Sequence, residues 1–474
     1  MPDDLLGLRD QAAALASGRV SARELVGAAL DRIQATQSTL NAFRWLRPEA
    51  ALAEADAADR RLVAGERLPL LGVPIAIKDD TDLAGEPTAF GARGDFPPQA
   101  ADSEMVRKLK AAGAVIVGKT NTPEFGQWPF TEGPAFGVTR NPWDLDHTPG
   151  GSSGGAAAAV AAGLVAAAVG SDGAGSVRIP AAWTNLVGIK PQRGRISSAP
   201  VPEQFNGLTT FGPLALTVGD AAMLLDVLSG SAPVDRDQPP APDEPFEVAA
   251  GRDPRRLRIG LSLKIPYSGM TARLDPTVQA AVEDVAAALE ALGHDVVPTD
   301  PAYGLLGVTF LPRSLEGIDD WAHRVPDPGL LDERTLANAR TGRMLRPLLL
   351  ASRAAEPVSR RWIGRVFQRV DVLLAPTTAV PPPRVGELNR PTNWDTDHAI
   401  VAACPFTWPW NVLGWPAVNV PAGLTASGLP MGAQLMGPAN SESLLISLAA
   451  QLERARRWYE RRPGQRAGTT PSAA

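Results

Sequence analysis

Residues 149–181 read PGGSSGGAAAAVAAGLVAAAVGSDGAGSVRIPA, and this stretch decides how the rest of the chain is interpreted. Clusters of serine and glycine stand at its two ends, with an alanine-rich run between them. The apolar run from Ala156 to Val169 is too short to cross the ~30 Å hydrocarbon core of a bilayer. We therefore interpret it as a buried helix and place the candidate chemistry in the two serine–glycine clusters.

Apolar strands alternate with amphipathic helices on both sides of this stretch. The β-branched run VPIAI at 73–77 predicts a buried strand, and Ser21 with Glu24 forms an S-x-x-E capping box that opens a helix. Further strands are expected at 114–118, 258–263, 294–298, 370–376 and 416–423, and further helices at 49–63, 103–112, 276–292 and 441–458. This alternation predicts an α/β layered fold.

One large domain is expected over residues 1–460. Residues 230–256 are rich in proline and charge and predict a surface linker inside it. The remaining parts are a helical N-terminal segment over about 1–68, a core over about 69–229, a C-terminal part over about 257–460 and a disordered tail at 461–474.

The composition, with 44% apolar and 20% charged residues, is ordinary for a folded protein. The formal net charge of −5 is spread along the chain, which argues against a nucleic-acid partner. The one cysteine, Cys404, excludes a disulfide framework and a cysteine-based zinc site, and we expect it to be a small buried hydrophobe. Four scattered histidines argue against a metal site. No export signal or membrane-spanning run is found, so a cytoplasmic protein is expected.

Residues 113–120, GAVIVGKT, match the phosphate-binding pattern G-x-x-x-x-G-K-[ST] letter for letter. That loop needs a flexible turn between its glycines. Here the residues from Ala114 to Val117 favour a strand, Gly113 favours a helix stop, and Pro123 opposes a helix beginning at Lys119. We therefore predict that this segment does not bind a nucleotide.

The first serine–glycine cluster also fits G-x-S-x-G, the nucleophile elbow of α/β-hydrolases, around Ser152 or Ser153. An elbow follows directly on an apolar strand, whereas RNPWDLDHTP at 140–149 is typical of a loop. The downstream candidates for a catalytic base are His294, His323 and His398. A Ser-His-Asp esterase resembling the α/β-hydrolases stays open as an alternative.

A longer match covers most of the chain. Residues 149–181 resemble the signature of the amidase signature family, in which the second serine–glycine cluster continues into S-[IV]-R-x-P. Ser152 and Ser176 stand 24 positions apart, which is the family's spacing, and Lys78 in VPIAIKDD resembles the family's lysine in V-x-[IV]-K-D. Other similar segments are 117–126, 141–151, 373–377 and 411–437, so the resemblance runs from about residue 20 to about residue 455.

The resemblance implies a fold and a catalytic triad. The fold is α/β, a single large domain with a central mixed β-sheet covered by helices on both faces. The triad is Ser–cis-Ser–Lys, in which Ser176 is the nucleophile, Ser152 the bridging serine in a cis peptide and Lys78 the base. Three residues are expected to support this site: Ser153 through the backbone and hydrogen bonds, and Asp172 with Arg178 by fixing the loop.

The segment GSDGAGS at 170–176 is then expected to form an oxyanion hole, because small residues let backbone N–H groups converge on one point. The expected donors are the N–H groups of Gly173, Ala174, Gly175 and Ser176. The commoner form in the family is GSDTGGS, so two positions differ here. An alanine at 174 would be strained if the loop demanded a positive φ there.

A lysine activates a serine only as the neutral amine, so the ordinary pKa of ~10.4 of Lys78 must fall. Lys78 follows an apolar strand, and burial there would lower its pKa. Asp79 and Asp80 would oppose this fall if their carboxylates approached the amine.

The function implied is an amidase that hydrolyses a small-molecule carboxamide to a carboxylate plus ammonia or an amine, through an acyl-enzyme on Ser176. No metal, cofactor, nucleic acid or membrane takes part, and a homodimer is an option for assembly. A glutaminase-type subunit of a tRNA-dependent amidotransferase is the other alternative, because it would share the triad and add partner subunits.

The substrate is poorly encoded in the sequence. Aromatic residues in loop-like segments either line an acyl pocket or belong to the core, and they are Trp128, Phe130, Phe406, Trp408, Trp410 and Trp415. Residues 303–345 match no shared segment, so we expect substrate contacts to differ there.

Overall fold

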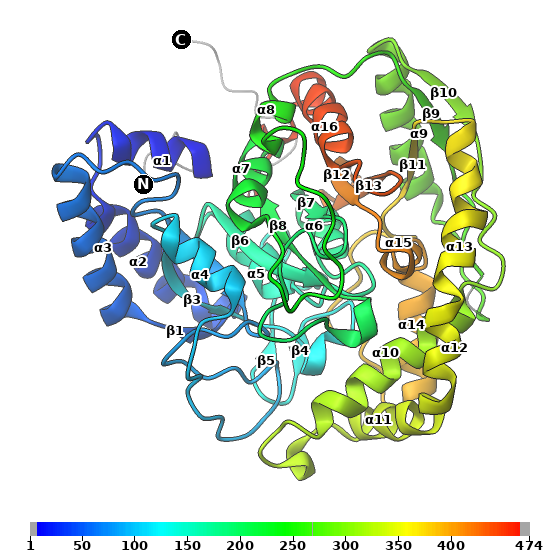
Figure 1. Cartoon of the computed structure of the whole chain (residues 1–474), viewed down its shortest axis with the longest axis horizontal. Helices are drawn as coiled ribbons and strands as arrows, with labels where there is room; N and C mark the ends of the chain where they lie inside the picture. The colour runs from blue at the N-terminus through cyan, green and yellow to red at the C-terminus, as the bar shows by residue number, and fades with distance from the viewer. Residues whose placement is uncertain (1–6, 268, 465–474) are drawn as a thin grey trace.

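The computed structural model describes residues 7–267 and 269–464, and within these residues a sheet of eleven strands runs through the centre of the molecule (Figure 1). From one edge to the other its strands are β1 (Phe43–Leu46), β3 (Val115–Thr120), β2 (Pro74–Lys78), β6 (Ala167–Asp172), β8 (Thr210–Ala215), β7 (Val187–Lys190), β12 (Ala417–Leu424), β13 (Pro430–Met436), β11 (Val372–Pro376), β9 (Arg258–Leu261) and β10 (Asp295–Pro298). Strands β3, β2 and β6 are parallel, as are β11, β9 and β10, and the strands between these two groups pair antiparallel. A separate pair consists of β4 (Glu132–Gly133) and β5 (Gly137–Val138).

Helices flank this sheet. In the first half of the chain they are α1 (Leu8–Ala16), α2 (Ala22–Leu40), α3 (Pro48–Val63), α4 (Glu104–Ala111), α5 (Gly154–Ala161), α6 (Arg178–Thr184), α7 (Val218–Leu228) and α8 (Phe246–Ala250). In the second half they are α9 (Pro276–Ala291), α10 (Gly307–Ala322), α11 (Glu333–Leu345), α12 (Leu349–Ala354), α13 (Glu356–Ile363), α14 (Asn393–Ala403), α15 (Trp408–Leu413) and α16 (Glu442–Arg456). The expected α/β class, with a large mixed central sheet flanked by helices, is confirmed. No helix among the described residues is both long and apolar enough to cross a membrane.

Helix ends follow local signals in the sequence. Ser21 caps α2, and its capping box with Glu24 has both hydrogen bonds in place. The side chain of Asp275 caps α9, and Pro276 occupies its first turn. Gly293 follows α9 with a φ of +93°, in the left-handed region that favours glycine after a helix. These boundaries agree with the prediction from sequence.

The alanine-rich run is half helix and half strand, so the expectation of one buried helix from Ala156 to Val169 is wrong. Helix α5 ends at Ala161, Gly163 turns the chain with a φ of +67°, and β6 begins at Ala167. The sequence hides this break because alanine suits both elements when they are fully buried. Every residue of α5 is buried, and small side chains let the helix lie close to the strands beneath it.

The predicted linker at 230–256 also contains packed structure. Helix α8 lies within it, and the buried side chains of Phe246 and Ala249 pack this helix against α7 and α16. The carboxylate of Asp226 accepts hydrogen bonds from the backbone N–H groups that begin α8. This short helix was not predicted because proline and charged residues surround it closely in the sequence. Of the expected disordered tail at 461–474, residues 465–474 lie outside the described residues.

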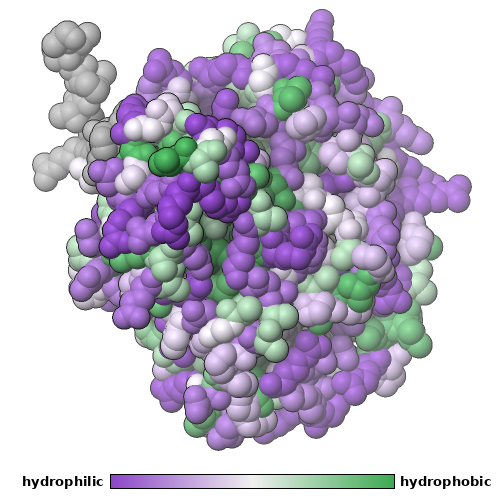
Figure 2. All heavy atoms as spheres, turned by 60° about the vertical axis from the view of Figure 1, so that its left-hand side comes forward, coloured by the Kyte–Doolittle hydropathy of each residue, from purple (hydrophilic) through white to green (hydrophobic). Residues whose placement is uncertain are grey.

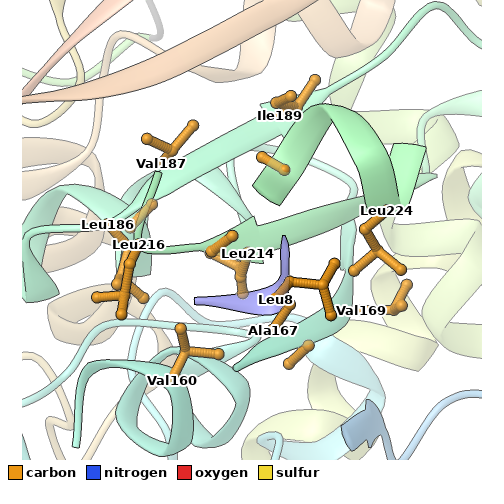
Figure 3. Close-up of a cluster of buried hydrophobic side chains, with 14 of the residues drawn as sticks. Leu8, Val160, Ala167, Val169, Leu186, Val187, Ile189, Leu214, Leu216 and Leu224 are labelled. Carbon is orange, nitrogen blue, oxygen red and sulfur yellow. The ribbon is translucent and has the colours of Figure 1, made fainter. Parts of the chain in front are cut away.

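The apolar core lies between the central strands and the helices beside them. Figure 3 shows leucine, valine, isoleucine and alanine side chains from β6, β7 and β8 meeting Val160 of α5, Leu224 of α7 and Leu8 of α1. The outer surface is mostly hydrophilic on the face drawn in Figure 2. This core holds the central strands rigidly, and the candidate site is built on their ends.

Strand pairing brings the candidate lysine to the second serine–glycine cluster. Strands β2 and β6 are parallel neighbours, with Ala76 opposite Ala168 and Ile77 opposite Val169. Lys78 is the last residue of β2, and β6 ends at Asp172. Because parallel strands end at the same edge of a sheet, Lys78 and the loop after β6 lie side by side.

Leu214→Ala in β8 is expected to lower the free energy of unfolding by about 2–5 kcal/mol, because it leaves a cavity in the fully buried cluster of Figure 3. Chemical denaturation followed by tryptophan fluorescence measures this change. The matched control is Leu350→Ala on α12, where the side chain is 81% exposed and the change should stay within about 0.5 kcal/mol. Equal losses in the two variants would contradict the assigned core.

Candidate active site

The amine of Lys78 is buried and donates a hydrogen bond to a serine of the first cluster. Its Nζ lies 2.7 Å from Ser152 Oγ, and both side chains are about 1% exposed. Gly126 makes this close approach feasible, because a Cβ there would lie 2.9 Å from Ser152 Oγ and 3.5 Å from Lys78 Nζ. The structure therefore brings together two of the three residues expected to form the triad.

A second serine and a carboxylate complete the surroundings of Lys78. Its Nζ also donates to Ser171 Oγ at 2.7 Å, and the Ser171 hydroxyl donates in turn to Asp80 Oδ2. Asp80 Oδ2 stands 3.5 Å from Nζ. Burial lowers the pKa of Lys78 and outweighs the charges of Asp80 and Asp172, which raise it. The net shift favours the neutral amine, as a base requires.

Asp79 points away from this lysine. Its carboxylate pairs with Lys119 of β3 at 3.1 Å, and Lys119 also donates to Pro87 O and Thr88 Oγ1. The segment GAVIVGKT is thus a helix stop at Gly113, with a φ of +87°, followed by a buried strand. Its lysine neutralises a buried carboxylate, and the segment lacks the turn that a phosphate-binding loop needs.

The backbone of the first cluster is fixed against the second. The peptide bond between Gly151 and Ser152 is cis, as the resemblance implies. The N–H of Ser153 donates to Ser176 O at 3.2 Å. Ser153 Oγ donates to Ser171 O and accepts from Ser171 N–H, so the two clusters are tied at both backbone and side chain.

Ser176 opens onto the cavity that Ser152 also lines. Ser176 is in the connection between β6 and α6. Among the described residues, no group is hydrogen-bonded to its Oγ. The hydrogen bond from Lys78 therefore reaches Ser152, while the link from Ser152 to Ser176 is not closed in this structure. Both hydroxyls face the same space, where a rotation of either side chain changes their separation.

Asp172 and Arg178 form a fully buried ion pair beneath the loop. Arg178 donates to both carboxylate oxygens at 3.0 Å, and it also bonds Gln434 and Asn411. Burial by itself raises the pKa of Asp172, but the Arg178 guanidinium and further donors lower it to about 2. The charged pair holds the loop between β6 and α6 in one conformation.

The loop offers three free amides where four were expected. The N–H of Gly175 donates to Asp172 Oδ1 at 2.8 Å, so it is not available to a substrate. Within the described residues, the N–H groups of Gly173, Ala174 and Ser176 have no protein acceptor. Gly175 carries the positive φ of the loop, +126°, whereas Ala174 is not among the residues with positive φ. The alanine that departs from the common family form is therefore unstrained.

A cavity of about 490 Å³ lies above these serines. It is walled mainly by apolar and aromatic residues from the loops after β2 and β3 and from α10, α14 and α15. Trp128 and Trp408 line it, whereas Phe130, Phe406, Trp410 and Trp415 are packed in the core. Helices α10 and α11 contribute residues between 307 and 341, so the segment without recognisable family motifs does form part of the wall.

Three phenylalanines in the cavity wall have left-handed backbones. Phe90, Phe125 and Phe205 have φ values of 47°, 53° and 46°. Their rings meet edge to face, with centroids of Phe90 6.0 Å from Phe125 and 6.3 Å from Phe205. Such backbones are rare for bulky residues and concentrate at functional sites. These three phenylalanines therefore combine an uncommon backbone conformation with packing of their rings.

Comparison with known proteins agrees with this geometry. The family model described as Amidase matches residues 24–446. A Mycobacterium tuberculosis protein named "Putative amidase AmiA2" is 57% identical over 95% of this chain and 93% of its own. A solved 6-aminohexanoate cyclic dimer hydrolase is 33% identical over 97% of this chain and 98% of that chain, with a TM-score of 0.87. A bacterial aryl acylamidase is 28% identical over 97% and 99%, with a TM-score of 0.87.

This chain belongs to the amidase family. It is therefore an enzyme of amide hydrolysis, and the pairing of Lys78 with Ser152 lies in the segments by which the sequence resembles that family.

The histidines of this amidase do not serve its serines. His294 bonds Leu257 N–H and Gln451, His323 and His398 bond backbone oxygens of their own helices, and His147 faces Asp144. No histidine contacts Ser152, Ser153 or Ser176 within the described chain. The arrangement that a Ser-His-Asp esterase needs is not formed.

Cys404 was expected to be a small buried hydrophobe, and the structure corrects this in part. It is half-buried and lines the amidase cavity at the end of α14. Burial raises the pKa of its thiol, so the thiolate is disfavoured. This exposure could not be predicted locally, because the cavity forms between segments far apart in the chain.

Several residues of the amidase site were missed from sequence alone. Ser171 bonds the lysine, and its place in GSDG next to Asp172 was the available signal. Phe90 and Phe125 are themselves neither glycine nor asparagine, so the glycine that follows each of them was the available signal for an unusual backbone. The cavity face of α14 could not be read from sequence without knowing what that helix packs against.

Asp172→Asn is expected to lower the free energy of unfolding by about 3–5 kcal/mol at pH 7, because Arg178 would stay buried without a counter-charge. The pKa of Asp172 in the folded protein, about 2, lies below its ordinary value of 3.8. The ionised carboxylate therefore stabilises the fold above about pH 4, and this stabilisation is lost as the pH falls toward 2.

Denaturant titrations at pH 7 measure the cost of the substitution, and a series from about pH 4 to about pH 2.5 measures how the stabilisation in the wild-type protein is lost. The matched control is Asp253→Asn, which breaks an exposed pair with Arg454 and should cost under about 1 kcal/mol. A buried-pair variant as stable as its exposed control would show that the loop is not held by this ion pair.

Proposed function

We propose that this amidase hydrolyses a small, largely apolar carboxamide to a carboxylate and ammonia or an amine, through an acyl-enzyme on Ser176. The observation that carries the proposal is the buried amine of Lys78, 2.7 Å from a serine that faces the same cavity as Ser176. In this proposal a base, a bridging hydroxyl and a nucleophilic hydroxyl that opens onto the cavity stand beside a pocket of ligand size.

The proton path begins at the neutral amine. Lys78 takes the proton of Ser152, Ser152 takes that of Ser176, and the Ser176 oxygen attacks the amide carbon. Catalytic hydrogen bonds are often open before substrate binds, so the proposed Ser152–Ser176 link closes when a substrate fills the cavity. Asp80 and Ser171 keep the lysine side chain aimed at Ser152.

The tetrahedral oxyanion is proposed to sit on the free amides of the loop after β6. Gly173, Ala174 and Ser176 have N–H groups without a protein acceptor among the described residues. The Gly175 amide bonds Asp172 instead and holds the loop in shape. Loss of one such donor typically costs ~2.7–4 kcal/mol of transition-state stabilisation.

Collapse of the intermediate returns the proton through Ser152 to the leaving nitrogen, which departs as ammonia or an amine. Water then enters, gives its proton to the same relay and attacks the Ser176 ester. The carboxylate leaves, and the hydroxyl of Ser176 and the neutral amine of Lys78 are restored. Every step uses groups that the chain itself supplies.

The cavity wall argues for an apolar substrate and against glutamine. Glutamine carries both an ammonium and a carboxylate, and a glutaminase would need a cationic side chain for the latter. Among the described residues, neither lysine nor arginine lines the cavity. The aromatic wall of Phe90, Phe125 and Phe205 suits alkyl or aryl groups better.

Ser176→Ala is expected to abolish amide hydrolysis and labelling by a fluorophosphonate probe, because it removes the attacking oxygen. Ammonia release from aliphatic and aryl amides measures the first, and mass spectrometry of the adduct measures the second. Ser427→Ala, in an exposed turn, is the control that should keep both. Near-native turnover by the Ser176 variant would refute the assignment of the nucleophile.

Asp80→Asn is expected to move the acidic limb of the kcat/KM profile to lower pH. Activity needs the neutral amine, so it falls as the pH drops through the pKa of Lys78. The charge of Asp80 raises that pKa, and its removal lets burial lower the pKa further.

The pH dependence of kcat/KM for one neutral amide measures this shift. Asp82→Asn removes the same charge two residues along, from a carboxylate that does not perturb Lys78, and should leave the limb in place. A limb that moves upward, or stays fixed in both variants, would contradict the role of Lys78 as the titrating base.

A further inference from the structure

One charged side chain lines the cavity among the described residues, and it is Asp397. The other lining groups are apolar, aromatic or uncharged polar. The proposed reaction gives this carboxylate no task, because the proton path runs from the end of β2 through the start of α5 to the loop after β6, which also carries the free amides. A charge in an otherwise apolar wall therefore requires its own explanation.

Asp397 belongs to the face of α14 that looks into the cavity. The lining residues of this helix follow helical spacing and are Asn393, Trp394, Asp397, Ile400, Val401 and Cys404. Asp395 stands on the same helix but does not line the cavity. Thr392 is the N-cap of α14, and its hydroxyl accepts from the N–H of Asp395 and donates to the Asp395 carboxylate. Asp397 is thus directed to the cavity by its position on the helix.

The Asp397 carboxylate lacks a partner in the protein. Within the described residues it is neither hydrogen-bonded nor ion-paired, although it is half-buried. Burial raises its pKa, and the neighbouring His398 is the one charge that opposes the rise. His398 itself turns back to bond Trp394 O and packs against that indole ring. A cation arriving in the cavity would supply the missing partner.

The helix sets how far this carboxylate lies from the reacting end of the cavity. Cys404 ends α14 beside the segment in which Thr407 Oγ1 donates to Ala174 O of the oxyanion loop. Cys404 lies seven positions after Asp397, which corresponds to about 10 Å along the helix at ~1.5 Å per residue. Ile400, Val401 and, from α10, Phe310 provide an apolar wall for the cavity.

We propose that Asp397 is a specificity-determining residue that binds an ammonium group at the end of the substrate remote from the scissile amide. The preferred substrate is then an amide whose acyl chain is an apolar spacer ending in a primary amine. Trp394, one turn before Asp397, places an indole at the same part of the cavity, where a cation is also favoured. This inference rests on the proposed function and adds the class of substrate.

The test compares ω-amino amides from 4-aminobutanamide to 8-aminooctanamide with alkanamides in which a methyl group replaces the ammonium. The measured quantity is the ratio of kcat/KM for the amino amide to that for its neutral partner. In the wild-type enzyme we expect this ratio to exceed one and to peak at one chain length. Asp397→Asn should lower the ratio by about tenfold or more, since a hydrogen bond to a charged group is lost. Asp395→Asn, with the same change in charge, should keep it.

Binding gives a second readout that does not depend on turnover. In the Ser176→Ala background, calorimetry should show tighter binding of the amino amide than of its neutral partner, and Asp397→Asn should remove this difference. Equal ratios and equal affinities in the wild-type enzyme and the Asp397 variant would overturn the inference while leaving the amidase proposal intact. Absence of hydrolysis of every amide together with absence of probe labelling would overturn the proposed function, and the binding comparison would still decide the role of Asp397.

Discussion

The site depends on a lysine amine that is removed from water at the end of a central strand. Removing a cation from water is unfavourable, and here the cost falls on the protonated form of Lys78, which becomes easier to deprotonate. Asp80 limits this effect without reversing it, and its position beside Ser171 keeps the amine directed toward Ser152. Burial thus lowers the pKa of the Lys78 amine, and the hydrogen bonds orient this amine toward Ser152.

Close packing of small residues makes that burial feasible. Helix α5 lies against β2, β3 and β6 with only glycine, alanine and valine side chains, so Ser152 and Ser153 at its start come within reach of strand ends. Larger side chains would lift the helix away from the sheet and separate Ser152 from Lys78. The alanine-rich composition that looks featureless in the sequence is therefore a geometric requirement of the site.

Local signals were enough to predict many of the elements, whereas the candidate site residues came from the resemblance to the family. The capping box at Ser21 and the strand before Lys78 agree with the structure, which also brings Lys78 to Ser152 and places Ser152 and Ser176 on one cavity. The break inside the alanine run was missed because helix and strand are equally compatible with buried alanine. The hydrogen bond from the Gly175 N–H to the Asp172 carboxylate was missed because it depends on the orientation of that side chain within the loop.

The shape of the cavity could not be predicted, although Trp128, Trp408 and part of 303–345 were candidates for its wall, because the wall joins segments far apart in the chain. Phe90, Phe310 and Asp397 meet around one space only after the sheet has brought their elements together. The two parts of the site obey different constraints as a result. The proposed relay lies on strand ends and a tightly packed helix, where the side chains are buried, whereas α10 and α14 contribute side chains to a space that the fold leaves open. In the proposed reaction, specificity can therefore change on these helices while Lys78 and its serines stay fixed, and the proposed role of the Asp397 carboxylate is to select which amide binds without taking part in the cleavage.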